Sequence, residues 1–333
     1  MICKKCKGKM NKAGFHISKK NGRVQKYQCP KCGSISIEQP NIEPIIEQPI
    51  KSKSKLSGQA FAPAHISGIF VIDMRNDPGF SGSIGCGICL EDGAATTVHP
   101  AKETRIRING VVSEAVTTLT AIELLTKAPV LVDTELSISS GAGLGASAAG
   151  ALSTALALNS ALCLDKTFND LSLVAHTAEV TNRTGLGDVS GQTCGGIDIR
   201  KKAGVPPVGI VDRIPCTDIP ISWVCFGRIS TKSVLSDDMK KKSINKAGRS
   251  RFKELLKKPS LENFFIQSKA FAKDIDLMSS KVKDAIEAVE ASGGFASQAM
   301  LGDTVFAMND GGSLLEFGKV RKSKISNAGA HLI

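Results

Sequence analysis

From residue 60 onward, the chain alternates between short apolar or period-two segments and longer segments with apolar residues at helical spacing. Period-two alternation is typical of strands with one buried face, and apolar residues three and four apart are typical of helices that pack on a core. Two stretches rich in glycine and serine, 79–87 and 139–147, interrupt this pattern and are predicted to be loops. The predicted strands are 69–72, 104–112, 130–137 and 304–308, and the predicted helices are 116–125, 148–164, 171–182 and most of 237–292, which Gly293-Gly294 ends.

The order of these elements predicts an α+β fold. Strands and helices are mixed without the regular strand–helix–strand repeat that builds a parallel sheet. With 333 residues, 42% of them hydrophobic, the chain is long enough for two or three domains and a sizeable core. It has no apolar run of about 18 residues, and its start lacks the apolar core of a signal peptide, so we expect a cytoplasmic protein without a membrane span.

Positive charge is concentrated at the N-terminus. Residues 1–59 hold 13 Lys and Arg against 3 Asp and Glu, whereas residues 60–333 hold 30 against 28. Because most of the chain is nearly neutral, a protein that binds nucleic acid over its whole surface is excluded. Contact with nucleic acid stays open only for the N-terminal segment, where the lysines could equally be solvated. The Lys-rich stretch 237–258 also contains Asp237, Asp238 and Glu254 and is predicted to be a solvated helix face.

Four cysteines near the N-terminus predict a metal site. Cys3-x-x-Cys6 and Cys29-x-x-Cys32 are two CxxC pairs with 22 residues between them, and four thiolates at this spacing can surround Zn²⁺ tetrahedrally. A segment this short cannot build a core of its own, so the metal would supply the folding energy. The alternative is a redox pair or two disulfides, which the missing secretion signal disfavours.

The richest glycine loop is Gly141-Ala-Gly-Leu-Gly-Ala-Ser147. It lacks the Lys of a Walker A loop, which is therefore excluded. It fits the spacing of a dinucleotide-binding loop, but the acidic residue at the right distance, Asp165, follows a helix and not a second strand. A third interpretation is a loop whose amides, with a helix N-terminus, hold a triphosphate, so that a side chain at Gly143 would fill the phosphate's space. The fourth is a turn that only lets the helix pack closely.

Residues 143–149, Gly-Leu-Gly-Ala-Ser-Ala-Ala, resemble the Pro-x-x-x-Gly-Leu-Gly-Ser-Ser-Ala-Ala motif of the galactokinase, homoserine, mevalonate and phosphomevalonate (GHMP) kinases. The motif's Pro is Ser139 here, and its first Ser is Ala146. Its second Ser, which the resemblance makes a magnesium ligand, is kept as Ser147.

Two further segments are similar to motifs of the same superfamily. Residues 61–68, Phe-Ala-Pro-Ala-His-Ile-Ser-Gly, are similar to the first motif, Ala-Pro-Gly-Lys, with Ala64 in place of the Gly and His65 in place of the Lys. The segment 292–302 stands where the C-terminal motif is expected.

Within this superfamily, the chain looks most like the archaeal-type pantoate kinases, and the resemblance covers about residues 60–330. It is carried by Phe-Ala-Pro-x-His-Ile-x-Gly, by Asp77-Pro78 followed by Gly-Ser-x-Gly at 82–85, and by the segments 184–189 and 200–209. The resemblance implies ATP-dependent phosphorylation of the primary hydroxyl of pantoate to 4-phosphopantoate in coenzyme A biosynthesis, and often a homodimer.

The fold implied by the resemblance is a GHMP kinase fold, with a ribosomal-S5-like N-terminal lobe and a ferredoxin-like C-terminal lobe. A small zinc ribbon, absent from the resemblance, would precede it. We therefore predict a zinc-ribbon-like module over 1–37, a proline-spaced linker over 38–59, and the two kinase lobes over 60–215 and 216–333.

The resemblance also implies roles for single residues. Asp188, in the Gly-Leu-Gly-Asp turn, would act as catalytic base or orient the acceptor hydroxyl, although an Asp there could simply cap the next turn. Ser147 and Glu179 would be oxygen ligands of Mg²⁺, which prefers hard oxygen donors. His65, Ser67 and Gly187 would contact the acceptor, although His65 could also be a core histidine. The loop residues that would bind the ATP phosphates are Gly141, Ala142, Gly143, Leu144, Gly145, Ala146 and Ser147.

Other candidate groups are assigned to packing. His176 stands three residues before Glu179 on one helix face, but two ligands make no metal site. Cys86-x-x-Cys89 lies in an apolar run without a second pair. Two rival functions remain: a homoserine or mevalonate kinase, and a zinc-ribbon nucleic-acid-binding protein with an inactive kinase-like domain.

Overall fold

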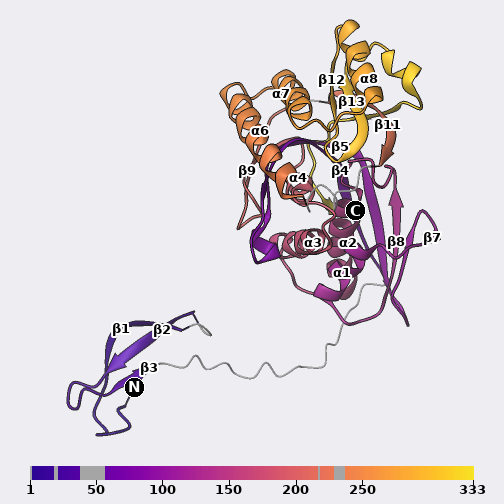
Figure 1. Ribbon diagram of the computed structural model, residues 1–333. Coiled ribbons are helices and arrows are strands. Elements are labelled where there is room, and N and C mark those ends of the chain that lie inside the picture. The colour runs from indigo at the N-terminus through magenta and orange to yellow at the C-terminus, as the bar shows by residue number, and fades with distance from the viewer. Residues whose placement is uncertain (1, 19–21, 38–56, 217, 229–236) are drawn as a thin grey trace. The chain divides into compact units, whose positions relative to one another are not determined.

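The structure is a computed structural model that describes residues 2–18, 22–37, 57–216, 218–228 and 237–333. The chain forms two compact units, 1–52 and 53–333, which are described separately (Figure 1). Most of the predicted linker, 38–59, lies outside the described residues. No helix in the described ranges is long and apolar enough to cross a membrane.

The first unit is a small antiparallel sheet with two cysteine turns. Its strands are β1 (Asn11–Ser18), β2 (Gly22–Gln28) and β3 (Ile35–Ile37), in that order. One CxxC pair precedes β1 and the other connects β2 to β3. Its buried core consists of the side chains of Cys3, Met10 and Cys29, with Cys6, Tyr27 and Cys32 packed against it.

The second unit is built on a long antiparallel hairpin of β4 (Gly58–Asp73) and β5 (Gly82–Pro100), joined through the 3₁₀ turn Pro78–Phe80. The prediction of a loop over 79–87 is wrong from Gly82 onward. The glycines there belong to a strand that a neighbour approaches closely: a Cβ on Gly85 would lie 2.0 Å from the carbonyl oxygen of Ile69.

Strand β5 also pairs with two strands on its other edge. Residues 94–100 pair with β8 (Val130–Leu136), and residues 85–88 pair with β9 (Ile197–Lys202). The sheet order is β10-β9-β5-β8-β6-β7, with β4 paired to β5 and to β15; the remaining strands are β6 (Arg105–Ile108), β7 (Val111–Val112), β10 (Ile210–Ile214) and β15 (His331–Leu332). The strand predicted over 104–112 is therefore a short hairpin, turned at Asn109-Gly110.

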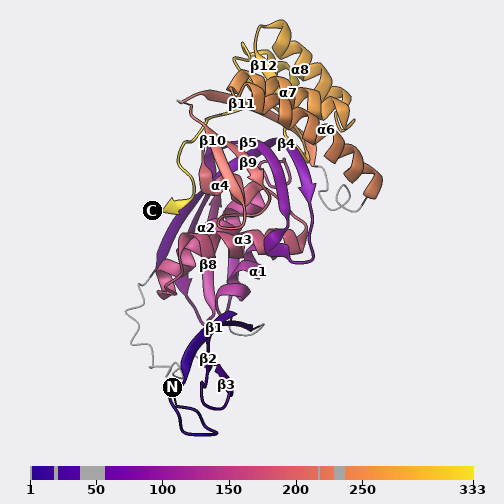
Figure 2. The same ribbon diagram turned by 90° about the vertical axis from the view of Figure 1, so that its left-hand side faces the viewer.

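Four helices accompany this sheet (Figure 2). They are α1 (Val116–Leu125), α2 (Ala146–Leu162), α3 (Phe168–Asn182) and α4 (Asp188–Cys194). Of these, α2 and α4 pack on the strands of the sheet, and α1 and α3 pack against α2. Helix α2 is buried along most of its length, and its alanines let it lie close to β4 and β5. The three longer helices confirm the sequence prediction, whereas α4 was not predicted.

The C-terminal part is an antiparallel sheet of order β12-β13-β11-β14 with three helices, and it completes the predicted α+β fold. Phe264 and Phe265 of α7 pack against Phe306 of β13, and Phe271 of α7 packs against Phe70 of β4, so one core joins this part to the first sheet. The strands are β11 (Pro220–Arg228), β12 (Phe295–Gln298), β13 (Gly302–Met308) and β14 (Arg321–Lys324), and the helices are α6 (Asp238–Lys257), α7 (Leu261–Asp274) and α8 (Ser280–Ala291).

Candidate active site

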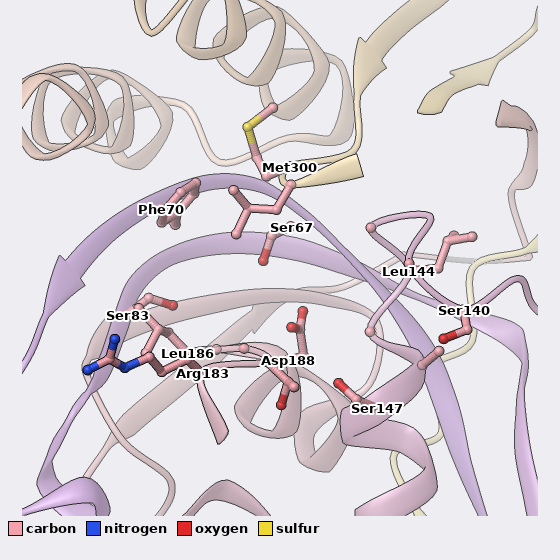
Figure 3. A pocket seen from close by; sticks show the side chains of 18 residues that line it. Ser67, Phe70, Ser83, Ser140, Leu144, Ser147, Arg183, Leu186, Asp188 and Met300 are labelled. Atoms are coloured by element: carbon pink, nitrogen blue, oxygen red, sulfur yellow. The ribbon is translucent and has the colours of Figure 1, made fainter. Parts of the chain in front are cut away.

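A cavity of about 320 Å³ lies where the glycine loop, the start of α4 and the C-terminal sheet meet (Figure 3). Its walls come from residues 140–147, from residues 183–188 and from the Met300–Leu301 turn before β13. Of the predicted site residues, the cavity is lined by Ser67, Gly141, Gly143, Leu144, Gly145, Ala146, Ser147, Gly187 and Asp188. Ala142, His65 and Glu179 are buried behind these walls.

The glycine loop leaves the start of α2 open toward the cavity. Gly141, Gly143 and Gly145 have φ angles of 79°, 77° and 63°, in the left-handed region that favours glycine. Gly145 is the N-cap of α2, and among the described residues no side chain makes a capping hydrogen bond to it. The first backbone N–H groups of a helix have no partner within the helix, and they form the positive end of the helix dipole. This part of the cavity wall therefore favours an anion.

The structure gives a further reason for glycine at position 143. A Cβ there would lie 2.9 Å from the amide nitrogen of Gly302 and 3.1 Å from the carbonyl oxygen of Met300. The missing side chain thus makes room for the turn before β13, and the space it leaves for a phosphate stays a prediction. Gly143 therefore holds the loop against the C-terminal part of the unit.

Ser147 and Glu179 are brought together by α2 and α3. The Ser147 hydroxyl donates to Oε1 of Glu179 at 2.7 Å, and Thr184 donates to the same oxygen at 3.3 Å. The other oxygen, Oε2, is buried and has no hydrogen-bond partner in the described part of the chain. Burial, and then the charge of Asp188, raise the pKa of Glu179 to about 8. An unpartnered buried carboxylate oxygen beside a hydroxyl fits a small cation with oxygen ligands.

Asp188 opens α4 with its carboxylate at the cavity wall. Its Oδ1 accepts from Nδ1 of His65 at 2.7 Å. The other face of the His65 ring meets Asp198 of β9, with Nε2 also 2.7 Å from Oδ1 of that residue. Burial lowers the pKa of His65, but the two carboxylates outweigh it and raise the pKa to about 9. His65 is fully buried and does not reach the cavity, so the predicted contact with an acceptor is replaced by a contact with Asp188.

Asp198 and Arg200, next to each other on one face of β9, are the functional candidates that sequence reasoning missed. Arg200 is ion-paired with Asp198 and donates from Nη2 to the Ser67 hydroxyl at 3.2 Å. Both side chains are fully buried, and Arg200 and His65 together hold the pKa of Asp198 below its usual range against the effect of burial. The only available signal was the pattern Ile-Asp-Ile-Arg over 197–200, which is typical of a strand with a solvent-exposed face.

Gly187 separates the buried guanidinium from the cavity by backbone alone. A Cβ on Gly187 would lie 2.2 Å from the Ser83 hydroxyl and 2.9 Å from Nε of Arg200. Within the described ranges, this buried Nε has no hydrogen-bond partner. Ser67 and Ser83 line the same cavity (Figure 3). Arg200 contacts the Ser67 hydroxyl, and Gly187 lies against both Arg200 and Ser83, so the cationic group lies behind these two hydroxyls.

The residues assigned to packing are buried. Nε2 of His176 lies 2.8 Å from the carbonyl oxygen of Ser81, and burial lowers the pKa of the ring. Cys86 and Cys89 are buried in β5, where burial raises the pKa of both thiols well above the usual value. A reactive role would require a low thiol pKa, so packing agrees with their environment.

In the first unit, the sulfur atoms of Cys3, Cys6, Cys29 and Cys32 all lie within 4.8 Å of one another. The shortest separations are 3.4 Å between Cys6 and Cys29 and 3.5 Å between Cys3 and Cys32, too long for disulfides. The four thiols form one tetrahedral-sized cluster, the donor set that Zn²⁺ prefers.

The comparisons with known proteins agree with this geometry. Residues 111–196 match the model of the GHMP kinases N terminal domain. The chain is 36% identical over 263 residues to a pantoate kinase of Thermococcus kodakarensis (75% of this chain, 87% of the relative) and 34% identical over 259 residues to one of Methanocaldococcus jannaschii (75% and 92%). A solved structure described as a phosphotransferase related to the CoA biosynthesis pathway superposes with a TM-score of 0.76 at 29% identity, covering 83% of this chain and 98% of that one.

Proposed function

This chain belongs to the pantoate kinase family of the GHMP kinases, and from this premise we propose that it phosphorylates the primary hydroxyl of pantoate with ATP, forming 4-phosphopantoate for coenzyme A biosynthesis. The observation that carries the proposal is a shared cavity. The open N-terminus of α2 and the Asp188 carboxylate lie side by side in the wall of this cavity, where a phosphoryl donor and an alcohol would meet.

The glycine loop and the start of α2 would bind the phosphates of ATP through backbone amides. Ser147 and Glu179 would hold Mg²⁺ with the hydroxyl oxygen and the unpartnered Oε2. When bound there, Mg²⁺ would neutralise charge on the phosphates and lower the pKa of Glu179 again.

A second cavity, of about 200 Å³, supports a place for the nucleotide base. It shares Ser140, Ala146, Ser147 and Thr184 with the main cavity, so both open on the start of α2. A flat heterocycle needs an apolar slot next to the phosphate site. The apolar walls of this slot are formed by Ile106, Ile108, Val116 and Leu136.

Asp188 would orient and deprotonate the acceptor hydroxyl. Its Oδ1 is engaged by His65, which leaves Oδ2 for the substrate proton. The proton would pass to Oδ2 while the alcohol oxygen attacks the terminal phosphorus of ATP, and ADP would leave.

The acceptor side of the cavity suits pantoate in both its polar and apolar groups. The hydroxyls of Ser67 and Ser83 would bind a carboxylate, and the buried Arg200 behind them would offset its charge. Phe70 and Met300 face this region in Figure 3 and would pack against the two methyl groups. Homoserine would place an ammonium group beside Arg200, which like-charge repulsion disfavours.

The test is a screen of the purified full-length chain for ADP release with pantoate, homoserine or mevalonate, against a control without acceptor. We expect release with pantoate, and loss of roughly 10²–10⁴ in kcat for Asp188→Asn, the usual contribution of a general base. Asp188→Asn should still bind ATP. Turnover with homoserine alone that survives Asp188→Asn would move the protein to the homoserine kinases.

For the first unit, we propose a structural Zn²⁺ bound by Cys3, Cys6, Cys29 and Cys32. Residues 1–37 hold ten Lys and Arg and no Asp or Glu, which suits contact with nucleic acid or an acidic protein. Metal analysis of the purified chain should give about one Zn²⁺, lost in the double variant Cys3→Ser, Cys32→Ser. A homodimer, a cytoplasmic location and the lobe boundary between 215 and 216 stay predictions.

A further inference from the structure

Behind Asp188, four charged side chains form a continuous buried chain. Asp188 is bonded to His65, His65 to Asp198, and Asp198 to Arg200, whose Nη2 reaches the Ser67 hydroxyl at the cavity. His65, Asp198 and Arg200 are fully buried. The two ends of this chain are the two groups that the proposed reaction needs, the carboxylate at the acceptor hydroxyl and the cation at the acceptor carboxylate.

Asp198 stands between two cations. Both ring nitrogens of His65 lie 2.7 Å from a carboxylate oxygen, and since an ionised carboxylate only accepts, the ring that satisfies both contacts is an imidazolium. Nη1 of Arg200 lies 3.1 Å from the same Nε2, so the two cations meet beside Asp198. The second oxygen of Asp198 receives Nη1 of Arg200. One carboxylate therefore contacts a cation on each side, and its single negative charge balances only one of the two.

The fold leaves space for this arrangement at two glycines. A Cβ on Gly87 of β5 would lie 2.2 Å from Nε2 of His65, and a Cβ on Gly191 of α4 would lie 2.4 Å from the same atom. The Gly191 Cβ would also lie 2.9 Å from Oδ1 of Asp198. Strand β5 and helix α4 therefore each place a glycine against the His65 ring, where a side chain would clash.

Such an arrangement is not explained by stability. Buried ion pairs lose solvation that their attraction barely restores, and apolar side chains of similar volume are often at least as stabilising. A buried charged chain that ends at the cavity on both sides is therefore better explained by what it does to the cavity.

We propose that Asp198 is a positioning residue that couples the acceptor-binding cation to the catalytic carboxylate. By holding His65 protonated, it keeps Oδ1 of Asp188 engaged and its Oδ2 directed to the acceptor. By the same carboxylate it holds Arg200 behind Ser67 and Gly187. Asp198 touches neither ATP nor acceptor in this scheme. The kinetic tests of this proposal rest on the proposed function, because they need turnover of pantoate. The test in the free protein does not.

The kinetic test compares Asp198→Asn with Asp212→Asn in the full-length chain. Asp212 is a matched control, since it pairs with Lys201 across β9 and β10 but lies at the surface. We expect Asp198→Asn to lower kcat at least tenfold and to raise the KM for pantoate at least tenfold, with the KM for ATP within threefold. Asp212→Asn should leave all three within twofold. A lower kcat with an unchanged KM for pantoate, or a higher KM with an unchanged kcat, would overturn the proposed coupling.

A double-mutant cycle tests the coupling itself. His65→Gln and Arg200→Lys should be non-additive in kcat/KM with Asp198 present, and should become additive within twofold in the Asp198→Asn background. Additive effects with Asp198 present would overturn the proposal.

The free protein gives a test that needs neither substrate nor a folded variant. In ¹⁵N-labelled wild-type chain at pH 7.5, both nitrogens of His65 should have the chemical shifts of a protonated imidazolium. Shifts of a neutral tautomer would overturn the proposal even if pantoate is phosphorylated. Failure to phosphorylate pantoate, with an imidazolium present, would instead refute the acceptor assignment and leave the buried chain intact.

Discussion

Replacing His65 by Gln should remove a pH-dependent part of the stability of the unit 53–333. The pKa of His65 is about 9 in the folded chain against 6.5 for a free histidine, so the folded state binds the proton more tightly than the unfolded state. The resulting stability is fully present below pH 6.5 and is lost as the pH rises through 9. At ~1.36 kcal/mol per pH unit, this interval corresponds to about 3 kcal/mol. Because the ring is fully buried, solvent screening does not reduce this value.

The sequence provides a specific probe for this measurement. Trp223 is the only tryptophan, and it is buried in β11, so its fluorescence reports unfolding of the second unit alone. Urea unfolding of wild type and His65→Gln between pH 6 and 9.5, without magnesium, gives the difference in free energy at each pH. His65→Gln should be several kcal/mol less stable at pH 6, because it leaves Asp188 and Asp198 without their shared cation. The gap should narrow by about 3 kcal/mol at pH 9.5.

Groups that face His65 could also titrate in this range. Glu179, with a pKa of about 8, titrates between pH 6.5 and 9. Repeating the unfolding measurements on wild type and His65→Gln in a Glu179→Gln background removes its contribution to the pH dependence. A free-energy gap that stays constant from pH 6 to 9.5 in both backgrounds would refute the charged ring. The other groups that face His65 are Asp188, Asp198, Arg200 and Cys89.

Three further predictions concern the loop, the metal and the first unit. Ser147→Ala and Glu179→Gln should each raise the magnesium concentration needed for half-maximal activity at least tenfold, since each removes a proposed ligand; unchanged magnesium titrations would contradict this site. Gly143→Val should lower the thermal midpoint even without ATP, because φ is 77° and the Cβ would clash with the backbone of Gly302; normal melting with a defect only in ATP binding would favour the phosphate explanation instead. Deleting residues 1–55 should leave kcat within a few-fold of the intact chain, and a folded but inactive truncation would show that the first unit takes part in catalysis.

The sequence predicted well those elements whose structure depends on residues nearby in the chain. Helix α1 begins and ends where the apolar spacing indicated, and α2 begins at the end of the glycine loop, because both depend on neighbours in sequence. Strand β5 was taken for a loop at its start because glycine and serine are common in loops. Its glycines are instead imposed by close neighbours such as Ile69, which local sequence does not contain.

The site divides in the same way. The glycine loop and Ser147 form a contiguous motif, so resemblance to the GHMP kinases was enough to identify them as candidate site residues. The contact between His65 and Asp198 joins residues 133 positions apart, and Asp198 looks like a surface residue on an alternating strand. Only the pairing of β9 with β5 places its side chain in the interior. Long-range pairings of this kind leave no periodic signal in a single sequence.

His65 and helix α4 connect Asp188 to the glycine loop, which has a consequence for the proposed reaction. The backbone amide of His65 donates to the carbonyl oxygen of Leu144 at 3.0 Å, while its side chain binds Asp188. Gln192, one turn along α4 from Asp188, donates from Nε2 to the carbonyl oxygen of Gly145 at 3.0 Å. Loop and carboxylate are thus tied to each other at two points. In-line phosphoryl transfer depends on the relative position of donor and acceptor, so this double attachment fixes the distance on which the reaction depends before either substrate arrives.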